Sequence, residues 1–481
     1  MKDNRTSVKR SLFVSAIALT LTAALLIGST FAWFTSTAST GVNKIQAGNL
    51  DVDLEMSTDG TNWESAEGKT LTFKTKDNRA ADQILWEPGC TYELPQLRVV
   101  NKGNLALKYK IQITGIQGDA KLNEVIDWTI NNAAIDLTEG HLTAGQQGDA
   151  FTIKGHMQDN ANNDYQNLTI DGIGITVCAT QDTVENDSVD NTYDKDAEYP
   201  ILVTTGDELQ AIVNNTTAPV NIVLTNNITT NNFVIPADKD VTLDLNGRTV
   251  KNAESHTILN KGHLTLTDSS ADKSGQIISC KADTAALRNG DNAVCVVEGG
   301  TISRDGANGN TWHTVENFGT MTFNGGKVIA DDGKSFAIVN GWNYINPGEQ
   351  KATMTINNIE MIAGPNGFKN CAGGTLTMNG GTLHCTGYWG LSNDSTGVAT
   401  INGGKIISDK YIAISDGGAK MEINGGTFTG PQGSLYVQDY AQDTVVKGGS
   451  YQNETVEFMQ RCCPKGYTAK LQGGMVVVSK D

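Results

Sequence analysis

The sequence predicts an all-β protein, a β-sandwich followed by a right-handed parallel β-helix. The chain has 52 Gly and 44 Asn but only 9 Pro among its 481 residues, and Gly and Asn tolerate the positive φ of tight turns. Residues 33–181 contain runs in which apolar and polar side chains alternate, as in half-buried strands. From residue 200 onward, two markers recur about every 23 residues, which is the signature of a solenoid.

Residues 1–32 are predicted to be a secretory signal peptide. Four basic residues between Lys2 and Arg10 precede the uncharged run 11–34, and the small-residue site Thr30-Phe31-Ala32 follows,. We expect a signal peptidase to cut between Ala32 and Trp33. A retained membrane anchor is the alternative, because the run is long enough to span a bilayer. Either outcome places the body of the protein outside the cell, secreted or associated with the surface.

The net charge of −17 argues against nucleic acid as a partner. Binding to phosphates needs a basic surface. An acidic surface instead keeps an exported protein soluble.

Residues 33–181 are predicted to form the β-sandwich. Period-2 alternation runs through 105–113, 173–177 and 50–54, while Pro88-Gly89 and Lys102-Gly103 mark turns,. Strands with one apolar face are buried most simply by packing two sheets together.

Six segments of the chain carry a recognisable pattern: Ile27-Gly28-Ser29-Thr30-Phe31-Ala32-Trp33-Phe34-Thr35, Ala47-Gly48-Asn49-Leu50-Asp51-Val52, Trp86-Glu87-Pro88-Gly89, Val99-Val100-Asn101-Lys102-Gly103, Leu105-Ala106-Leu107-Lys108-Tyr109 and Ala179-Thr180-Gln181-Asp182-Thr183-Val184-Glu185. Together they resemble the camelysin/TasA-like family of Gram-positive bacteria, whose members are exported through a SipW-type signal peptidase. The resemblance covers about residues 11–195.

The resemblance implies a jelly-roll module that assembles into extracellular-matrix fibres of a biofilm. In such fibres an N-terminal strand, exposed by signal cleavage, completes the next subunit, and an open sheet edge can accept such a strand. The segment in this chain is 33–47, from Trp33 to Ala47. Alternatively, it is a loose arm or folds back on its own domain. Part of the family is classed as metallopeptidase, but His141 and His156 lack the paired-His helix pattern of a zinc site,.

Residues 182–199 are predicted to be an acidic linker. Clustered carboxylates could hold Ca²⁺, although their spacing fits no calcium loop and a solvated linker is the alternative. No other cofactor or metal is expected. The acidic residues are Asp182, Glu185, Asp187, Asp190, Asp194, Asp196 and Glu198.

Residues 200–452 are predicted to form about nine coils of the β-helix, a rod of roughly 40 Å. Identical positions stack from coil to coil, so the recurring Asn side chains should form hydrogen-bonded ladders. The first marker comprises Asn324, Asn379, Asn402 and Asn424, with variants at Glu298, Asn357 and Lys447. The second marker comprises Asn317, Asn340, Asn370, Asn393, Asp416 and Asp439.

Two apolar columns flank the first marker and are predicted to face the core. Residues 207–214 and 453–481 should cap the two ends, which would otherwise expose sheet edges. The architecture resembles the pectate-lyase-like β-helix superfamily. The columns are Val297, Phe323, Ile356, Met378, Ile401, Ile423 and Val446, and Ile302, Val328, Met361, Leu383, Ile406, Phe428 and Tyr451.

No catalytic residues are predicted. A hydrolase needs paired carboxylates, and the coils offer Arg304-Asp305, Asp331-Asp332 and Asp409-Lys410 only as scattered loop charges. The superfamily's Gly-His-Gly signature is absent.

Aromatic residues give the candidate ligand site. Trp312, Tyr388 and Tyr411 share one position of the repeat, and Trp342 and Trp389 lie close in sequence. Ring faces on one side of a rod could contact sugars. Alternatively, the rings simply stack against each other or within the coils.

The eight Cys residues leave the redox state open. Cys295 falls in an apolar column and is predicted to be a buried thiol. Cys90 and Cys178 could form a disulfide in the first domain.

The sequence therefore predicts an exported, non-catalytic surface or matrix protein that self-associates through residues 33–47 and displays a rod for adhesion or contact with polysaccharide. The alternative is a secreted polysaccharide lyase or hydrolase of the β-helix type.

Overall fold

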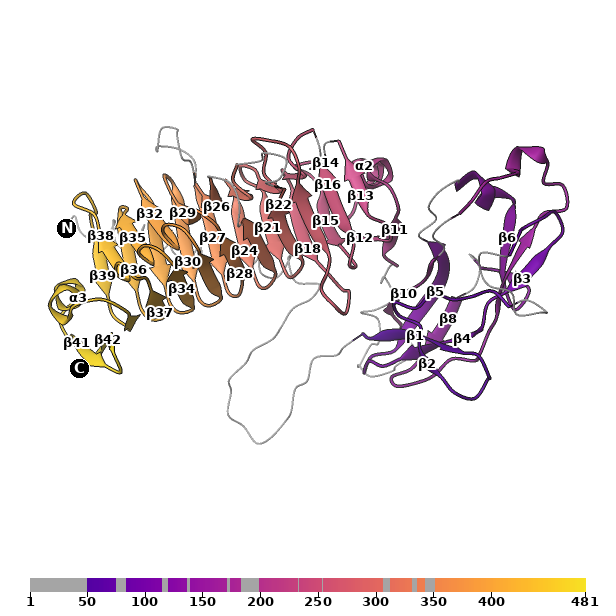
Figure 1. The fold of residues 1–481 in the computed structure, drawn as a ribbon, viewed down its shortest axis with the longest axis horizontal. Coiled ribbons are helices and arrows are strands. Elements are labelled where there is room, and N and C mark those ends of the chain that lie inside the picture. The colour runs from indigo at the N-terminus through magenta and orange to yellow at the C-terminus, as the bar shows by residue number, and fades with distance from the viewer. Residues whose placement is uncertain are drawn as a thin grey trace, which may run out of the picture.

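The computed structural model describes residues 50–74, 84–114, 120–135, 139–170, 174–182, 199–231, 233–252, 254–305, 312–330, 335–341 and 351–481. The signal peptide, the Ala32–Trp33 site and the segment 33–47 lie outside these residues. Within the described ranges, no helix combines the length and apolar character needed to cross a membrane. The chain forms an N-terminal β domain and a long β-solenoid (Figure 1).

The N-terminal domain consists of three small antiparallel sheets around one apolar core. Leu97, Leu107, Ile111 and Ile153 are fully buried there, and the alternating runs of the sequence become β1, β5 and β10. The first sheet has the strand order β2 (Glu64–Ser65), β1 (Val52–Ser57), β4 (Gln96–Asn101), and the second has the order β10 (Gly174–Gln181), β5 (Leu107–Thr114), β8 (Glu139–Leu142). The third has the order β3 (Thr91–Glu93), β9 (Ile153–Met157), β6 (Ile126–Ile130), β7 (Ala133–Ala134). Two 3-10 helices, η2 (Ala120–Val125) and η4 (Asn163–Tyr165), lie between strands.

The solenoid is a parallel β-helix of the right-handed type with three long sheets,. Sheet 1 contains β11 (Ile201–Val203), β12 (Val220–Leu224), β15 (Asp240–Asp244), β18 (His263–Thr267), β21 (Val294–Val297), β24 (Thr320–Phe323), β27 (Ala352–Ile356), β30 (Gly374–Met378), β33 (Val398–Ile401), β36 (Lys420–Ile423) and β39 (Thr444–Val446). Sheet 2 contains β13 (Ile228–Thr230), β16 (Thr249–Asn252), β19 (Gln276–Ser279), β22 (Thr301–Arg304), β25 (Lys327–Ala330), β28 (Glu360–Ala363), β31 (Thr382–Cys385), β34 (Lys405–Ser408), β37 (Thr427–Thr429), β40 (Gly449–Tyr451), β42 (Met475–Lys480) and β41 (Tyr467–Gln472). Sheet 3 contains β14 (Phe233–Ile235), β17 (Ile258–Asn260), β20 (Leu287–Asn289), β23 (Val315–Asn317), β26 (Phe336–Asn340), β29 (Asn366–Asn370), β32 (Leu391–Asp394), β35 (Ile414–Gly417) and β38 (Leu435–Val437).

Each coil contributes one strand to each sheet. Nine coils, from β12–β13–β14 to β36–β37–β38, are complete, and β39 and β40 begin a tenth. Both apolar columns predicted from the sequence are buried, and every residue in them has 0 % exposed surface. The prediction of a β-helix is therefore confirmed, because these residues alternate with solvent-facing neighbours on short strands.

Both ends of the solenoid are capped. At the first end, α2 (Gly206–Asn215) buries Leu209 and Val213 against the opening coils. At the last end, α3 (Val456–Cys462) packs on the core and β42 pairs antiparallel with β40. One oxygen of Glu454 also accepts the backbone N–H groups of Ser434 and Leu435, at 2.6 and 2.9 Å. Because no further coil follows at this position, these two N–H groups would otherwise lack an acceptor, and the Glu454 carboxylate supplies it.

The junction between the two parts brings both ends of the acidic segment together. Asp182 Oδ2 lies 2.6 Å from His141 Nδ1, and the Tyr199 hydroxyl donates to Glu139 Oε2 at 2.9 Å. His141 and Glu139 are neighbours on β8, and Nζ of Lys110 lies 4.8 Å from the centre of the Tyr199 ring. The linker residues that flank 183–198 are thus both attached to the first domain.

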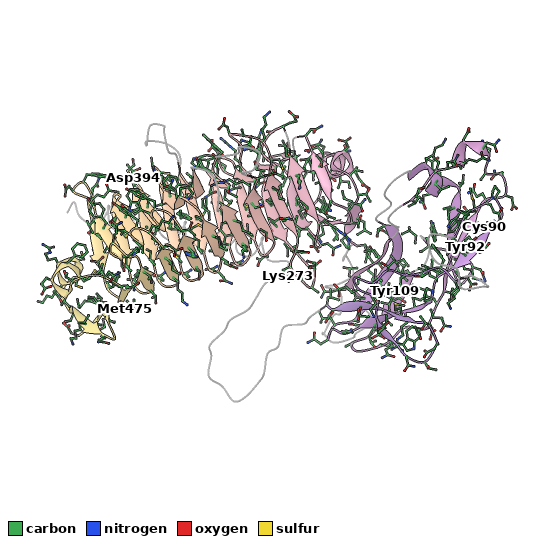
Figure 2. The ribbon with its side chains drawn as sticks, in the orientation of Figure 1. Cys90, Tyr92, Tyr109, Lys273, Asp394 and Met475 are labelled. Carbon is green, nitrogen blue, oxygen red and sulfur yellow. The ribbon has the colours of Figure 1, made fainter. Side chains whose placement is uncertain are left out.

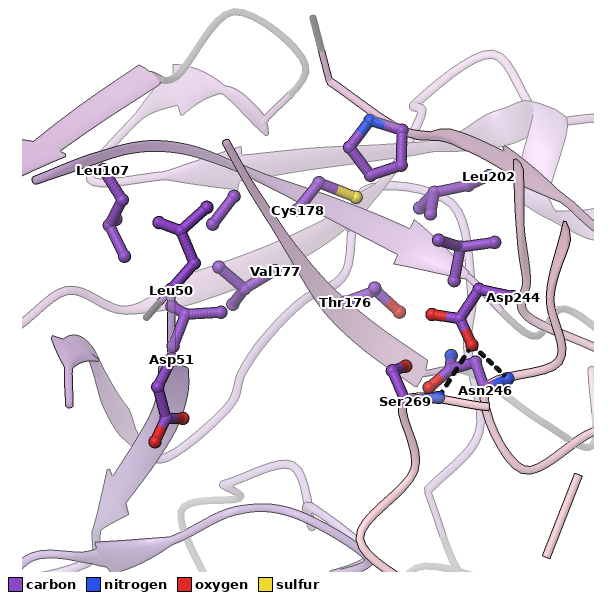
Figure 3. Close-up of a pocket in the computed structure, with 14 residues that line it drawn as sticks. Leu50, Asp51, Leu107, Thr176, Val177, Cys178, Leu202, Asp244, Asn246 and Ser269 are labelled. Carbon is purple, nitrogen blue, oxygen red and sulfur yellow. Dashed lines mark hydrogen bonds between the residues drawn. The ribbon is translucent and has the colours of Figure 1, made fainter. Parts of the chain in front are cut away.

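A mostly apolar cleft lies at this junction (Figure 3). The first domain lines it with Leu107 and Val177, and the first coils line it with Leu202 and Asp244. Asp244 Oδ1 accepts the backbone N–H groups of Asn246 and Ser269, at 2.9 and 2.8 Å. The Asp244 carboxylate is therefore used in holding turns of the solenoid.

Candidate functional site

The second marker forms a fully buried amide ladder inside the solenoid. Asn317 Nδ2 donates to Asn340 Oδ1 at 2.8 Å, and the same bond repeats in coil after coil. Each Nδ2 also donates to a backbone carbonyl of a nearby strand. We call this set the inner ladder; its members are Asn260, Asn289, Asn317, Asn340, Asn370, Asn393 and Asp416.

The inner ladder differs from its prediction at both ends. It starts earlier, at Asn260 and Asn289. Asn260 lies 29 residues before Asn289, and Asn289 lies 28 residues before Asn317. These spacings depart from the 23-residue period, so the sequence pattern did not include the two residues. Asp439 does not belong to it, because the strand register places Val437 opposite Asp416. The ladder ends at Asp416, whose carboxylate accepts from Asn393 and from the Thr444 hydroxyl at 2.9 and 2.6 Å.

The first marker forms a second, exposed ladder along the corner after sheet 1. We call it the outer ladder; its members are Glu298, Asn324, Asn357, Asn379, Asn402 and Asn424. Its amides donate toward the N-terminal end of the rod and finish on the Glu298 carboxylate, whereas the inner ladder donates toward the C-terminal end and finishes on Asp416. A row of amides needs a final acceptor, so each ladder ends on a carboxylate in its own direction.

Three of the five predicted aromatic residues come together at the corner between sheets 2 and 3. The rings of Tyr388 and Tyr411 stack at 4.2 Å with planes 8° apart, and Trp389 meets Tyr388 edge-on at 4.2 Å. Tyr388 is 39 % exposed. Because each tyrosine covers one face of the other, the corner is a stacked pair rather than the flat column that the sequence suggested,. The Tyr411 hydroxyl raises the pKa of Tyr388.

Trp312 belongs to a different cluster. It precedes β23, three coils from Tyr388, so about 14 Å separates their positions along the axis. Its indole N–H donates to Glu316 Oε1 at 2.7 Å, and Arg288 binds Glu316 Oε2 at 2.9 Å. Burial raises the pKa of Glu316, an effect that the Arg288 guanidinium opposes. Trp342 lies outside the described residues.

Two histidines near this cluster have lowered pKa values, from which we predict that the solenoid loses stability in acid. Burial, with Arg288 nearby, lowers the pKa of His256 from 6.5 to about 4, and burial lowers that of His313 to about 4, with Arg304 and Lys369 adding to the effect. His256 Nδ1 also accepts the Ala285 N–H at 2.9 Å, which requires an unprotonated nitrogen. The folded state therefore keeps both rings neutral where the unfolded chain binds protons.

We expect the free energy of unfolding to fall as the pH drops from 6.5 to 4, and to fall less steeply in a His256→Gln, His313→Gln variant. Chemical denaturation at several pH values measures both slopes. Equal slopes in the two proteins would exclude these histidines as the cause.

Two of the loop carboxylates noted in the sequence, Asp305 and Asp409, do not form a hydrolase pair. Asp305 and Asp409 follow β22 and β34, four coils apart, or about 19 Å along the axis, beyond the separation that glycoside hydrolysis uses. Asp409 instead lies 2.9 Å from His384. Arg304 is buried and donates to the carbonyl of Trp312, and Asp331-Asp332 lies outside the described residues.

No group of three or more potential metal ligands occurs within the described ranges. Of the predicted calcium ligands only Asp182 is described, and it is engaged by His141; residues 183–198 lie outside. His156, whose Nδ1 lies 2.8 Å from Thr91 Oγ1, is on a different sheet from His141.

The predicted disulfide between Cys90 and Cys178 is wrong, because all eight Cys residues are free thiols. Cys90 lies beside Tyr92 at the far end of the first domain (Figure 2), whereas Cys178 lines the junction cleft. Cys295 is fully buried as predicted, and burial raises its pKa to about 12.

Comparison with known proteins gives no relative. No family model, curated protein or solved structure matches the chain.

Proposed function

We propose that this is an exported, non-catalytic protein of the cell surface or extracellular matrix. Its first domain would be a jelly-roll module that joins subunits by exchanging the strand 33–47. Its solenoid would be a stiff rod displayed for adhesion or contact with polysaccharide. The observation that carries the proposal is the regular solenoid of nine complete coils, held by two continuous ladders and closed by caps.

The construction of the rod supports a mechanical role. Its core side chains are fully buried, and the inner ladder runs along the rod without a break from Asn260 to Asp416. Because every coil contacts its neighbours through three parallel strands, bending requires many hydrogen bonds to change together. Such a body suits display at a distance from the first domain.

The open edges of the first domain support strand exchange. Within the described residues, β10 pairs with β5 on one side and with no strand on the other. It is eight residues long, and an edge of that length offers backbone donors and acceptors to an added strand. Residues 33–47 precede β1 in the chain and include the apolar residues Val42 and Ile45.

Electron microscopy of the secreted protein, with its N-terminus sequenced, tests the proposal. We expect the mature chain to begin at Trp33 and to form filaments as its concentration rises. Deletion of residues 33–47 should abolish the filaments, because the exchanged strand is removed. Circular dichroism should show an unchanged β signal in the deletion variant. Secreted protein that stays monomeric at all concentrations would refute assembly by strand exchange.

A further inference from the structure

The outward face of sheet 1 carries a regular array of threonines. In three consecutive coils the exposed positions are Thr-x-Thr-x-Asn, and the fourth has Val in the first position. Strand pairing places equal positions opposite one another, so the residues form columns. We call this array the threonine grid; its rows are Thr320, Thr322 and Asn324; Thr353, Thr355 and Asn357; Thr375, Thr377 and Asn379; and Val398, Thr400 and Asn402.

The threonine grid is open to solvent and uncharged. Its twelve residues are exposed or half-buried, and the threonine hydroxyls make no hydrogen bond with any described residue. Beyond its two ends the same columns carry Glu298 on one side and Lys420 and Glu422 on the other, and the exposed Lys351 lies two residues before Thr353. In a chain with a net charge of −17, a neutral area of this regularity is distinctive.

The grid is also rigid. Its strands β24, β27, β30 and β33 are neighbours in sheet 1 (Figure 1), and β-branched Thr has few rotamers. The third column is the outer ladder, in which each amide is fixed by the next at 2.8 Å. Rows repeat about every 4.8 Å along the rod and columns lie about 6.6 Å apart. A ligand would therefore meet a preorganised surface.

We infer that the threonine grid binds an extended, neutral polysaccharide lying along the rod axis. Hydroxyl and amide groups match the hydroxyls of sugars, and the threonine methyls can pack against their C–H groups. Because each row offers the same groups, successive residues of a linear polymer can bind successive coils, and weak contacts accumulate. The net charge of −17 on the chain disfavours polyanions.

The inference rests on the proposed function and gives it a site other than the aromatic corner. At that corner Tyr388 and Tyr411 each use one ring face to stack on the other. The grid offers threonine hydroxyls as donors and acceptors over about four coils. It lies on sheet 1, whereas the aromatic corner lies between sheets 2 and 3. Variants can therefore separate the two sites.

Retention of the full secreted chain on insoluble cellulose and chitin tests the inference. We expect retention of the native protein and a loss of more than tenfold in a Thr355→Lys, Thr377→Lys variant, because the longer side chains hold a polymer away from the grid. A Thr355→Val, Thr377→Val variant keeps the shape but lacks two hydroxyls, and we expect about tenfold weaker retention. Soluble polygalacturonate should not compete.

A Thr301→Lys, Thr382→Lys variant is the matched control, because it places the same change on the outward face of sheet 2. Its retention should stay within about twofold of the native value, with thermal unfolding confirming that all variants fold. Equal losses in both lysine variants, or a loss only after Tyr388→Ala, would overturn the inference. Retention in growing ice without retention on glycans would also overturn it. Filaments that bind neither glycan would refute the grid site and leave matrix assembly standing.

Discussion

Asn370→Ala should lower the free energy of unfolding of the solenoid by about 3–5 kcal/mol. Asn370 accepts from Asn340 and donates to Asn393 Oδ1 and to the Val398 carbonyl, at 2.8, 2.8 and 3.1 Å. Asn340, Asn370 and Asn393 all have 0 % exposed surface. Removal of the central amide leaves donors and acceptors on both sides without partners in a region that excludes water. Denaturation in guanidinium, followed by circular dichroism, measures the loss.

Asn379→Ala is the matched control for that prediction, because Asn379 occupies the outer ladder one strand away. It donates to Asn357 and accepts from Asn402, each at 2.8 Å, but it is exposed. Water can replace both bonds, so we expect a loss below about 1 kcal/mol. Equal losses in the two variants would show that burial of the inner ladder contributes nothing to stability.

Gly418→Ala should lower the free energy of unfolding by about 2–3 kcal/mol. A Cβ atom at this position would lie 2.1 Å from Asn393 Nδ2 and 2.6 Å from the carbonyl oxygen of Gly397. The Gly418 backbone does not have a positive φ, so the expected cost comes from overlap with the inner ladder. The same guanidinium denaturation measures it, and the change should be largest in the last coils.

Gly473→Ala separates steric overlap from backbone strain. Gly473 has a φ of +57° in the β41–β42 turn, and a Cβ there would meet no atom within 4 Å. Only the left-handed backbone then opposes alanine, so we expect a loss of about 1 kcal/mol. A larger loss for Gly473→Ala than for Gly418→Ala would contradict the role assigned to the ladder.

Much of the fold could be predicted from the sequence because the coil repeats. Two markers that recur about every 23 residues, together with the buried apolar columns, predicted the number of coils and the central members of both ladders. The spacings of 29 and 28 residues that follow Asn260 and Asn289 depart from this period, so these two members of the inner ladder were not predicted. Asp439 lies 23 residues after Asp416, as the period requires, but strand pairing places Val437 and not Asp439 opposite Asp416. The register of a strand is set by its packing and not by sequence spacing.

The aromatic site was predicted only in part. Tyr388 and Tyr411 come from the same position of adjacent coils, so their proximity follows from the period. Their stacking depends on side-chain rotamers, which the period does not specify. The hydrogen bond from Trp312 to Glu316 also involves Arg288, a side chain from another coil. Cys90 and Cys178 were paired on their presence in one domain, but distance within the fold prevents a bond between them.

The sequence by itself determined the local pattern: which residues turn, which face inward and which recur. The tertiary structure decided how the ladders run, where each ends on a carboxylate, and which outward threonines share a face. The physical reason is that a single coil specifies only its own strands, whereas the rows of the threonine grid come from positions 22 to 33 residues apart. Strand pairing and the packing of the buried columns bring those rows into register.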